Sequence, residues 1–176
     1  RLADETFSFW AGENTSGLQT EGLRSLSSFS LWPFPMYTYR MSNRFQLKKT
    51  IFMPRERNAS IILYEAANTS SERAKVSVAL LVNSRGFHAV TQRGQMSWSF
   101  VQRDSEHGVL IEPSTSHSAL MLFSAEGNYA AGSGEWVEAY HRVEAQRGES
   151  SVDYSYKQGG FEFDIQPNET KPFSIV

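Results

Sequence analysis

Cysteine is absent from the 176 residues of this chain. Disulfide bonds, thiolate metal sites and cysteine nucleophiles are therefore excluded. The absence is compatible with a reducing compartment, and we expect a cytoplasmic protein. The chain also lacks any apolar run that approaches the roughly 18 residues of a transmembrane helix, so we expect no membrane partner.

An excess of one charge is missing as well. The chain carries 17 basic and 19 acidic residues, for a net charge of −2. This balance gives no electrostatic basis for binding nucleic acid. The segment "QGGF" has neither the spacing nor the lysine of a phosphate-binding loop. We therefore expect no nucleic-acid partner and no cofactor.

Motifs for metal binding and catalysis are equally sparse. No histidine has a second histidine at helical or hairpin spacing, so we expect no metal site; the four are His88, His107, His117 and His141. No "GxSxG" elbow marks a nucleophilic serine. A glycosidase pair needs two carboxyl groups roughly 5–10 Å apart, a geometry that the sequence does not define. The available carboxylates are Glu135, Glu138, Glu144, Glu149 and Asp153.

Short runs with alternating apolar and polar residues dominate what is present. They include "ETFSFWAG", "MYTYRM", "RFQLKKTIFM", "SIILYEA", "AKVSVALLV", "MSWSFVQ", "GVLIE", "ALMLFS" and "GFEFDIQ". Period-two alternation is typical of half-buried strands, and turn-forming residues separate the runs. About ten or more such strands predict an all-β, antiparallel β-sandwich that occupies residues 1–176 as one domain.

One segment departs from this alternation. "EWVEAYHRVEAQRG" places Trp136, Tyr140 and Val143 at helical spacing, with Gly148 at the position of a C-terminal cap. We expect a short helix or an irregular crossover near residues 135–148.

Charged residues bunch in and after that segment. We expect Glu144 and Asp153 to pair with Arg142 or Arg147 and to brace backbone that has no ladder partner. If the pair is buried, Arg147→Ala would cost roughly 3–5 kcal/mol. A pair of catalytic carboxylates is the alternative interpretation.

Aromatic residues offer a second kind of candidate. In "SLWPFPMYTYRM", Pro33 and Pro35 favour extended, edge-like backbone around Trp32. An exposed indole can stack on the apolar face of a sugar ring. Tyr37 and Tyr39 share one face of a strand, where packing within the sheet is the simpler interpretation. Trp32 is therefore the candidate for carbohydrate contact.

Several segments, in order, resemble the N-terminal domain of bacterial and archaeal glycogen debranching enzymes of the amylo-α-1,6-glucosidase type. The similarity covers most of residues 30–165. Four motifs carry it: Pro33 and Pro35 with the following tyrosines; Lys49, Met53, Asn58 and Tyr64 in "LKKTIFMPRERNASIILYE"; Asn83, Arg85 and His88 in "LLVNSRGFHAV"; and Tyr140, Glu144, Arg147, Gly148, Asp153 and Gly160 in "YHRVEAQRGESSVDYSYKQGGF". Gly86 stands where the family usually has Asp.

The resemblance implies a part in glycogen catabolism. In this family the sandwich precedes an (α/α)₆ barrel that carries the catalytic carboxylates, so it implies no catalytic residue here. The partners it implies are that barrel, on the same chain, and an α-glucan. Trp32, Arg85 and His88 become candidate substrate contacts, whereas Glu144, Arg147 and Asp153 become a structural motif.

Both ends of the sequence look cut. The chain lacks an initiator Met, and "KPFSIV" ends on a run that should lie within a strand. We expect an N-terminal part of a longer enzyme. Two alternatives remain open: a stand-alone carbohydrate-binding module, and a sandwich-fold sugar epimerase that uses a His and a Glu.

Overall fold

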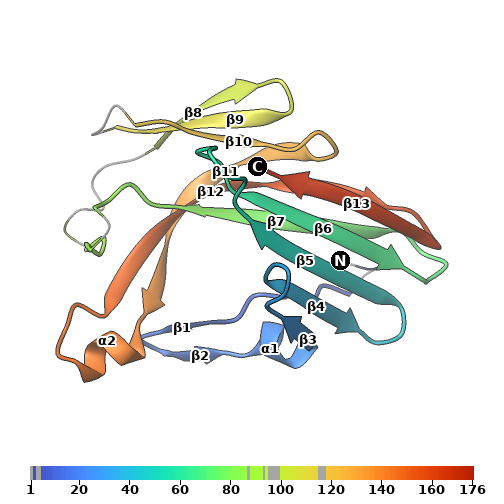
Figure 1. Ribbon diagram of the computed structural model, residues 1–176, viewed down its shortest axis with the longest axis horizontal. Coiled ribbons are helices and arrows are strands. Elements are labelled where there is room, and N and C mark those ends of the chain that lie inside the picture. The colour runs from blue at the N-terminus through green and yellow to red at the C-terminus, as the bar shows by residue number, and fades with distance from the viewer. Residues whose placement is uncertain (1, 3–4, 87, 93, 95–99, 115–117) are drawn as a thin grey trace.

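The protein is described by a computed structural model that covers residues 2, 5–86, 88–92, 94, 100–114 and 118–176. Its two larger sheets face each other, and a smaller sheet covers one end (Figure 1). All strand pairs are antiparallel. The predicted all-β fold class is confirmed, because the helices are two short segments among many strands.

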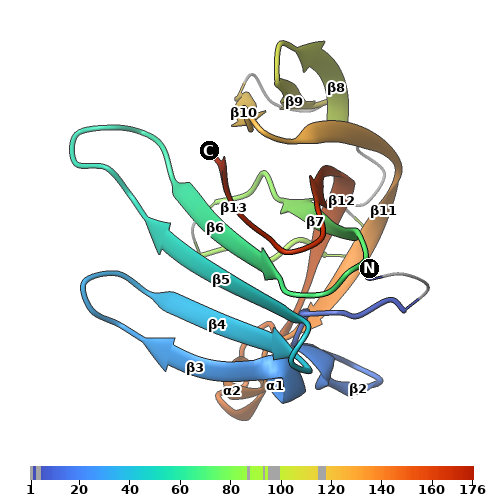
Figure 2. The ribbon, with the colours of Figure 1, turned by 90° about the vertical axis from the view of Figure 1, so that its right-hand side faces the viewer.

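The first large sheet has five strands in the order β13-β6-β5-β4-β3. Their bounds are β3 (Leu26–Ser30), β4 (Met36–Met41), β5 (Phe45–Phe52), β6 (Ile61–Asn68) and β13 (Glu169–Ile175). The hairpin loops 31–35 and 53–60 project on the same side of this sheet (Figure 2). The predicted strands "RFQLKKTIFM" and "SIILYEA" are confirmed, and they pair as the β5–β6 hairpin.

The second large sheet has three strands in the order β11-β12-β7. They are β7 (Ala74–Val82), β11 (Asn128–Tyr140) and β12 (Val152–Ile165). The alternation in β7 is confirmed, since Val76 and Val78 pack into the core while Lys75 and Ser77 face solvent. Inward-facing residues of both sheets, including Phe45, Leu47, Tyr64, Val76, Phe161, Phe163, Ile165 and Phe173, form the main core.

A smaller sheet, β10-β9-β8, packs at one end over a second apolar cluster. It contains β8 (Phe100–Ser105), β9 (Gly108–Pro113) and β10 (Leu120–Phe123). At the other end lie the hairpin β1 (Gly12–Asn14) and β2 (Gly17–Gln19), followed by α1 (Glu21–Ser25). Among the described residues, no helix combines the length and the hydrophobicity that crossing a bilayer requires.

The predicted helix near 135–148 is shorter than the helical spacing suggested. Only α2 (Arg142–Gln146) is helical, and Trp136 and Tyr140 belong to β11 instead. Cross-strand pairing with Tyr156 and Val152 explains this, because ladder hydrogen bonds hold both residues extended. The run "ETFSFWAG" was also predicted to be a strand, but residues 6–11 are irregular. Part of "MSWSFVQ" lies outside the described residues.

Candidate functional site

Two segments that the sequence analysis singled out lie on one open cleft of about 850 Å³. One follows β7, and the other is the loop between β11 and β12 that contains α2. The cleft is lined by Arg85, His88, Ala89, Val90, Gln92, His141, Glu144, Arg147, Glu149, Ser150 and Asp153. The structure therefore brings Arg85 and His88 together with Glu144, Arg147 and Asp153.

Asp153 is the central anion of this cleft. Its side chain is only 6% exposed, and Arg85 Nη2 donates a hydrogen bond to Oδ2 at 2.8 Å. The Thr91 N–H donates to Oδ1 at 2.8 Å. The N–H of Tyr154 donates to the same oxygen at 2.9 Å. These contacts compensate the lost hydration of a buried carboxylate, which is otherwise costly.

A second set of hydrogen bonds fixes the segment after β7. Thr91 Oγ1 donates to Asn83 Oδ1 at 3.2 Å, and Asn83 Nδ2 donates to Ser155 Oγ at 2.9 Å. Arg85 also donates to the Ala89 carbonyl. Because Ser155 lies on β12 beside Asp153, the network ties an irregular loop to a central strand.

The predicted ion pair of Asp153 with Arg142 or Arg147 is wrong. Its partner is Arg85, whereas Arg142 bonds to Glu13 on β1 at 2.6 Å. Arg147 does contact Glu144, at 3.4 Å, but its side chain is 67% exposed. The physical reason is direction: α2 projects from the tip of its hairpin, so its charged side chains face solvent rather than the buried end of β12.

The end of α2 follows the sequence prediction closely. Gly148 has φ 76°, a left-handed conformation that suits glycine. The N–H of Gly148 donates to the Ala145 carbonyl at 3.1 Å, and the N–H of Glu149 donates to the Glu144 carbonyl at 2.9 Å. This pair of bonds is the Schellman motif, and it satisfies carbonyls that a helix end leaves open.

The chemistry available in the cleft is mainly that of a rigid polar surface. Asp153 is fully engaged by its donors, and His141 Nε2 lies 4.0 Å from Oδ2. His88 lines the cleft with an interaction of its own. Hydroxyl groups of a sugar could meet the exposed carboxylates and arginines along the walls. Among the described residues, no group of three His, Asp or Glu side chains is arranged to hold a metal ion.

Trp32 lies away from this cleft and does not line it. It sits in the β3–β4 turn, where the residue is 86% exposed. Around it is a group of apolar residues that we name the hairpin cluster: Leu31, Trp32, Phe34, Phe52 and Met53. The rings of Phe34 and Phe52 lie 5.2 Å apart, so the two projecting loops share one apolar surface.

Sequence reasoning missed a second cavity, which lies between the two large sheets. It measures about 390 Å³ and its walls are mostly aromatic and aliphatic, with Lys49 among them. The alternation in "RFQLKKTIF" was the available signal, because Lys49 shares its face of β5 with Phe45 and Leu47. In the sequence, Lys49 stood out only as part of the family resemblance.

The family described as glycogen debranching enzyme N terminal matches residues 1–171. A comparison with curated proteins gives no match. The match spans both segments of the polar cleft, the hairpin cluster and the two large sheets as far as the first residues of β13. The chain therefore belongs to the family of glycogen debranching enzyme N-terminal domains.

Proposed function

We propose that this chain is a non-catalytic sandwich domain of a glycogen debranching enzyme. In this account it supports the (α/α)₆ barrel that carries amylo-α-1,6-glucosidase activity, and it contacts the α-glucan near the catalytic cleft. The observation that carries the proposal is the exposed hairpin cluster on a domain of this family.

The hairpin cluster has the composition of a protein-binding surface. Trp32 is 86% exposed, Met53 is 68% exposed and Leu31 is 64% exposed, and all three lie on neighbouring loops. Aromatic residues and methionine are enriched at interfaces between proteins. A contiguous apolar surface of this kind marks a contact with another protein surface or domain. In this proposal the surface contacts the catalytic barrel, which follows this domain in enzymes of the family.

A carbohydrate-binding module would show a different surface. Such a module needs flat aromatic rings spaced along a solvent-facing row, so that successive sugars can stack on them. Here none of the described tyrosines is exposed, and the hairpin cluster mixes one indole with Leu, Phe and Met. The composition favours docking over binding of a glucan chain by this domain alone.

The polar cleft is the second surface in the proposal. Arg85 and His88 line it beside exposed acidic groups, which suits hydrogen bonds to sugar hydroxyls. Asp153 holds Arg85 in place from below. In this account the cleft forms an outer wall for a branched glucan, while the acid and base that cleave the bond belong to the barrel.

Substitutions in the hairpin cluster test the docking. In the intact enzyme that carries this chain, the double variant Trp32→Ser/Met53→Ser should lower glucose release from branched dextrin at least about tenfold. The melting temperature of this chain alone should not fall, since both side chains are exposed. Met121→Ser is the matched control, because Met121 is a 47% exposed methionine on β10. Unchanged turnover in the double variant would contradict docking through this surface.

Glucan contact requires a separate measurement. We expect weak or absent glycogen binding by this chain, with Trp32→Ala weakening any binding that is measured. His88→Ala probes the cleft in the same titration with maltoheptaose. A binding affinity that neither substitution changes would remove both residues from the glucan surface and leave the docking proposal standing.

A further inference from the structure

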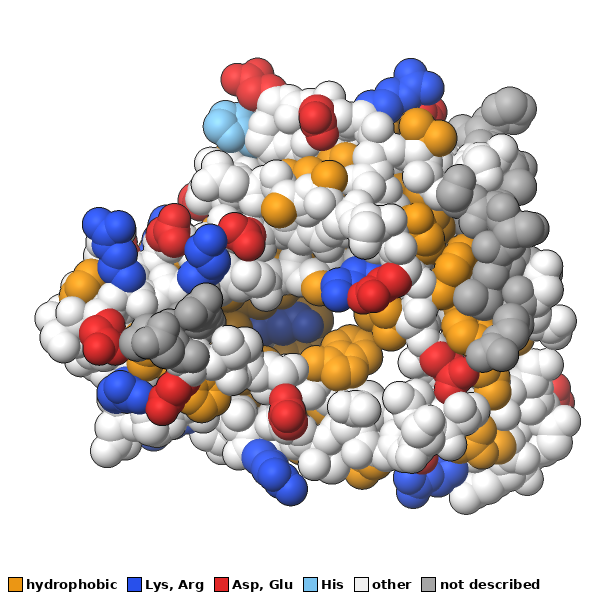
Figure 3. All heavy atoms as spheres, turned by 180° about the vertical axis from the view of Figure 1, so that it is seen from behind, with side chains coloured by type: hydrophobic (Ala, Val, Ile, Leu, Met, Phe, Trp, Pro, Cys, Tyr) orange, Lys and Arg blue, Asp and Glu red, His pale blue; other side chains and the backbone are white. Residues whose placement is uncertain are grey.

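The cavity between the two large sheets opens to solvent. Viewed from behind, the surface is hollowed, and hydrophobic side chains surround a basic one inside the hollow (Figure 3). Residues of β4, β5 and β6 form one wall, and residues 75–79 of β7 form the other. The volume of about 390 Å³ lies within the range of small-molecule sites.

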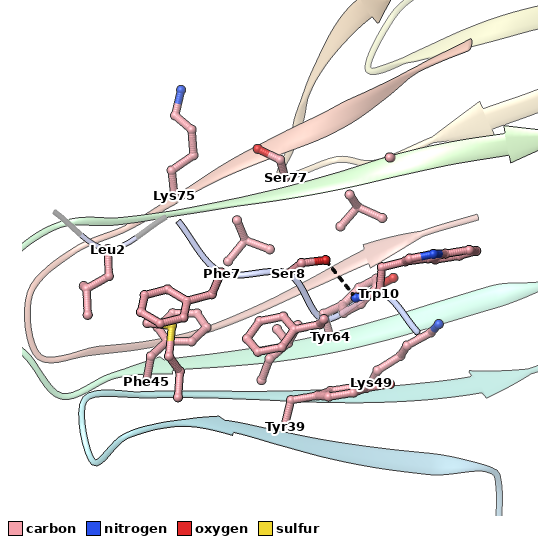
Figure 4. A pocket seen from close by; sticks show the side chains of 16 residues that line it. Leu2, Phe7, Ser8, Trp10, Tyr39, Phe45, Lys49, Tyr64, Lys75 and Ser77 are labelled. Atoms are coloured by element: carbon pink, nitrogen blue, oxygen red, sulfur yellow. Dashed lines mark hydrogen bonds between the residues drawn. The ribbon is translucent and has the colours of Figure 1, made fainter. Parts of the chain in front are cut away.

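Residues 7–10 cross this cavity as an irregular strap (Figure 4). The N–H of Trp10 donates to Ser8 Oγ at 3.2 Å, and the Trp10 carbonyl accepts from the Gly22 N–H at 2.8 Å. Phe7 and Trp10 are partly exposed, so the strap adds aromatic surface to the cavity without sealing it.

Lys49 places a positive charge on a wall of the cavity that is otherwise mostly apolar. It lies opposite Tyr37 on β4 and Tyr64 on β6, on the face of the sheet that packs into the core. Its ammonium lies 5.9 Å from the centre of the Tyr37 ring. No carboxylate among the described residues pairs with it. Burial lowers the pKa of Lys49, because removal from water disfavours the charged ammonium.

The neighbouring lysines, Lys48 and Lys75, each form an ion pair with a carboxylate. Lys48, on the outer face of the same strand, bonds to Glu65 at 2.7 Å. Lys75 bonds to Glu162 at 3.0 Å, and its ammonium points away from the cavity (Figure 4). Lys49 instead directs its side chain along the cavity toward Trp10 (Figure 4).

Two phenol groups add hydrogen-bond donors. Tyr39 and Tyr64 both line the cavity, and burial raises the pKa of each hydroxyl, that of Tyr64 to about 12. Tyrosine hydroxyls are protonated at neutral pH, so both can donate a hydrogen bond to an anion. A few polar groups that converge in an otherwise apolar cavity are typical of ligand sites.

We propose that this cavity binds a small organic anion, with its apolar or aromatic body between the sheets and its oxyanion at Lys49. The anion supplies the missing counter-charge, and the aromatic walls bury the body. A neutral sugar fits less well, because it would leave the half-buried ammonium without a counter-charge. The proposal is independent of docking, since Lys49 is separate from the hairpin cluster.

The fluorescent anion 8-anilinonaphthalene-1-sulfonate is the probe for this site. We expect one probe to bind per chain, and Lys49→Met to weaken binding at least about tenfold, or about 1.4 kcal/mol. Lys48→Met is the matched control and should bind as the unsubstituted chain does. Lys49→Arg keeps the charge and should retain most of the affinity. The neutral probe N-phenyl-1-naphthylamine should not distinguish Lys49→Met from Lys48→Met.

Competition then identifies the oxyanion. Phenylacetate and phenyl phosphate should each displace the probe, and the stronger competitor shows whether a carboxylate or a phosphate is preferred. Maltotriose should not displace it. Absence of probe binding, equal losses in Lys49→Met and Lys48→Met, or displacement by maltotriose alone would overturn the proposal. Near-ultraviolet circular dichroism confirms that each variant keeps its fold.

Discussion

Arg85 and Asp153 stand 68 positions apart in the sequence, yet their side chains form an ion pair of 2.8 Å beneath the polar cleft. The pair joins the loop after β7 to the start of β12. It is also shielded, because the Arg85 side chain is 29% exposed and that of Asp153 only 6%. Such a pair fixes the relative position of two segments that no strand ladder connects.

Asp153→Ala should therefore destabilise the fold strongly. The substitution leaves the Arg85 guanidinium and the N–H groups of Thr91 and Tyr154 without their acceptor. We expect the free energy of unfolding to fall by about 3–5 kcal/mol. Urea denaturation, followed by tryptophan fluorescence, measures the loss.

Arg147→Ala serves as the control for this prediction. The Arg147–Glu144 pair is exposed, so its removal should change the free energy of unfolding by less than about 1 kcal/mol. The sequence-based estimate of 3–5 kcal/mol assumed a buried pair, and the structure removes that assumption. Equal losses in the two variants would show that burial does not distinguish the pairs.

Stability should fall at alkaline pH because of Tyr64. Burial, with a smaller contribution from Tyr39, raises the pKa of Tyr64 from 10.0 to about 12. Above pH 10 the unfolded chain loses this proton first, so the favourable contribution present below pH 10 disappears as the pH rises to 12. The difference is about 2–3 kcal/mol for two pKa units.

Tyr64→Phe provides the measurement. The free energy of unfolding of the variant should decline less between pH 10 and 12 than that of the unsubstituted chain. Urea titrations at several pH values give both slopes. Parallel slopes would mean that the Tyr64 hydroxyl ionises as readily in the fold as in the unfolded chain.

Gly22 should tolerate no side chain. A Cβ at this position would lie 2.3 Å from the Phe9 carbonyl oxygen and 2.6 Å from backbone of Trp10. Gly22→Ala must displace the strap over the cavity, at a cost of about 1–3 kcal/mol. It should also weaken binding of the anionic probe.

Gly86→Ala is the comparison for the Gly22 substitution. A Cβ there meets no atom of the described residues within 4 Å, so the melting temperature should hardly change. Differential scanning calorimetry measures the melting temperatures of both variants. A Gly22→Ala variant as stable as Gly86→Ala would show that the strap adjusts freely.

Local patterns in the sequence predicted local structure well. The runs "MYTYRM" and "AKVSVALLV" coincide with β4 and β7 residue for residue, and Gly148 ends α2 as expected. These features depend on neighbours in the chain, which a sequence displays directly. Helical spacing at Trp136 and Tyr140 was misleading, because pairing with β12 outweighs a weak local preference.

Contacts between distant segments were much harder to predict. The motifs at residues 83–88 and 140–153 were both recognised, but nothing in either indicates that Arg85 is the partner of Asp153. Such a contact depends on the order of strands in the sheet, here β11-β12-β7, which places the two segments side by side. The position of Lys49 was readable from alternation. That no carboxylate in the described part of the chain pairs with it needed the three-dimensional arrangement.

The central claim is that this domain supports debranching without carrying out the chemistry. The most direct measurement is the release of glucose from an α-1,6-branched limit dextrin by the pure chain, with the intact enzyme as the positive control. We predict turnover by the intact enzyme and none by the chain. Sustained glucose release by the pure chain, abolished by substitution of a carboxylate in the polar cleft, would contradict the account.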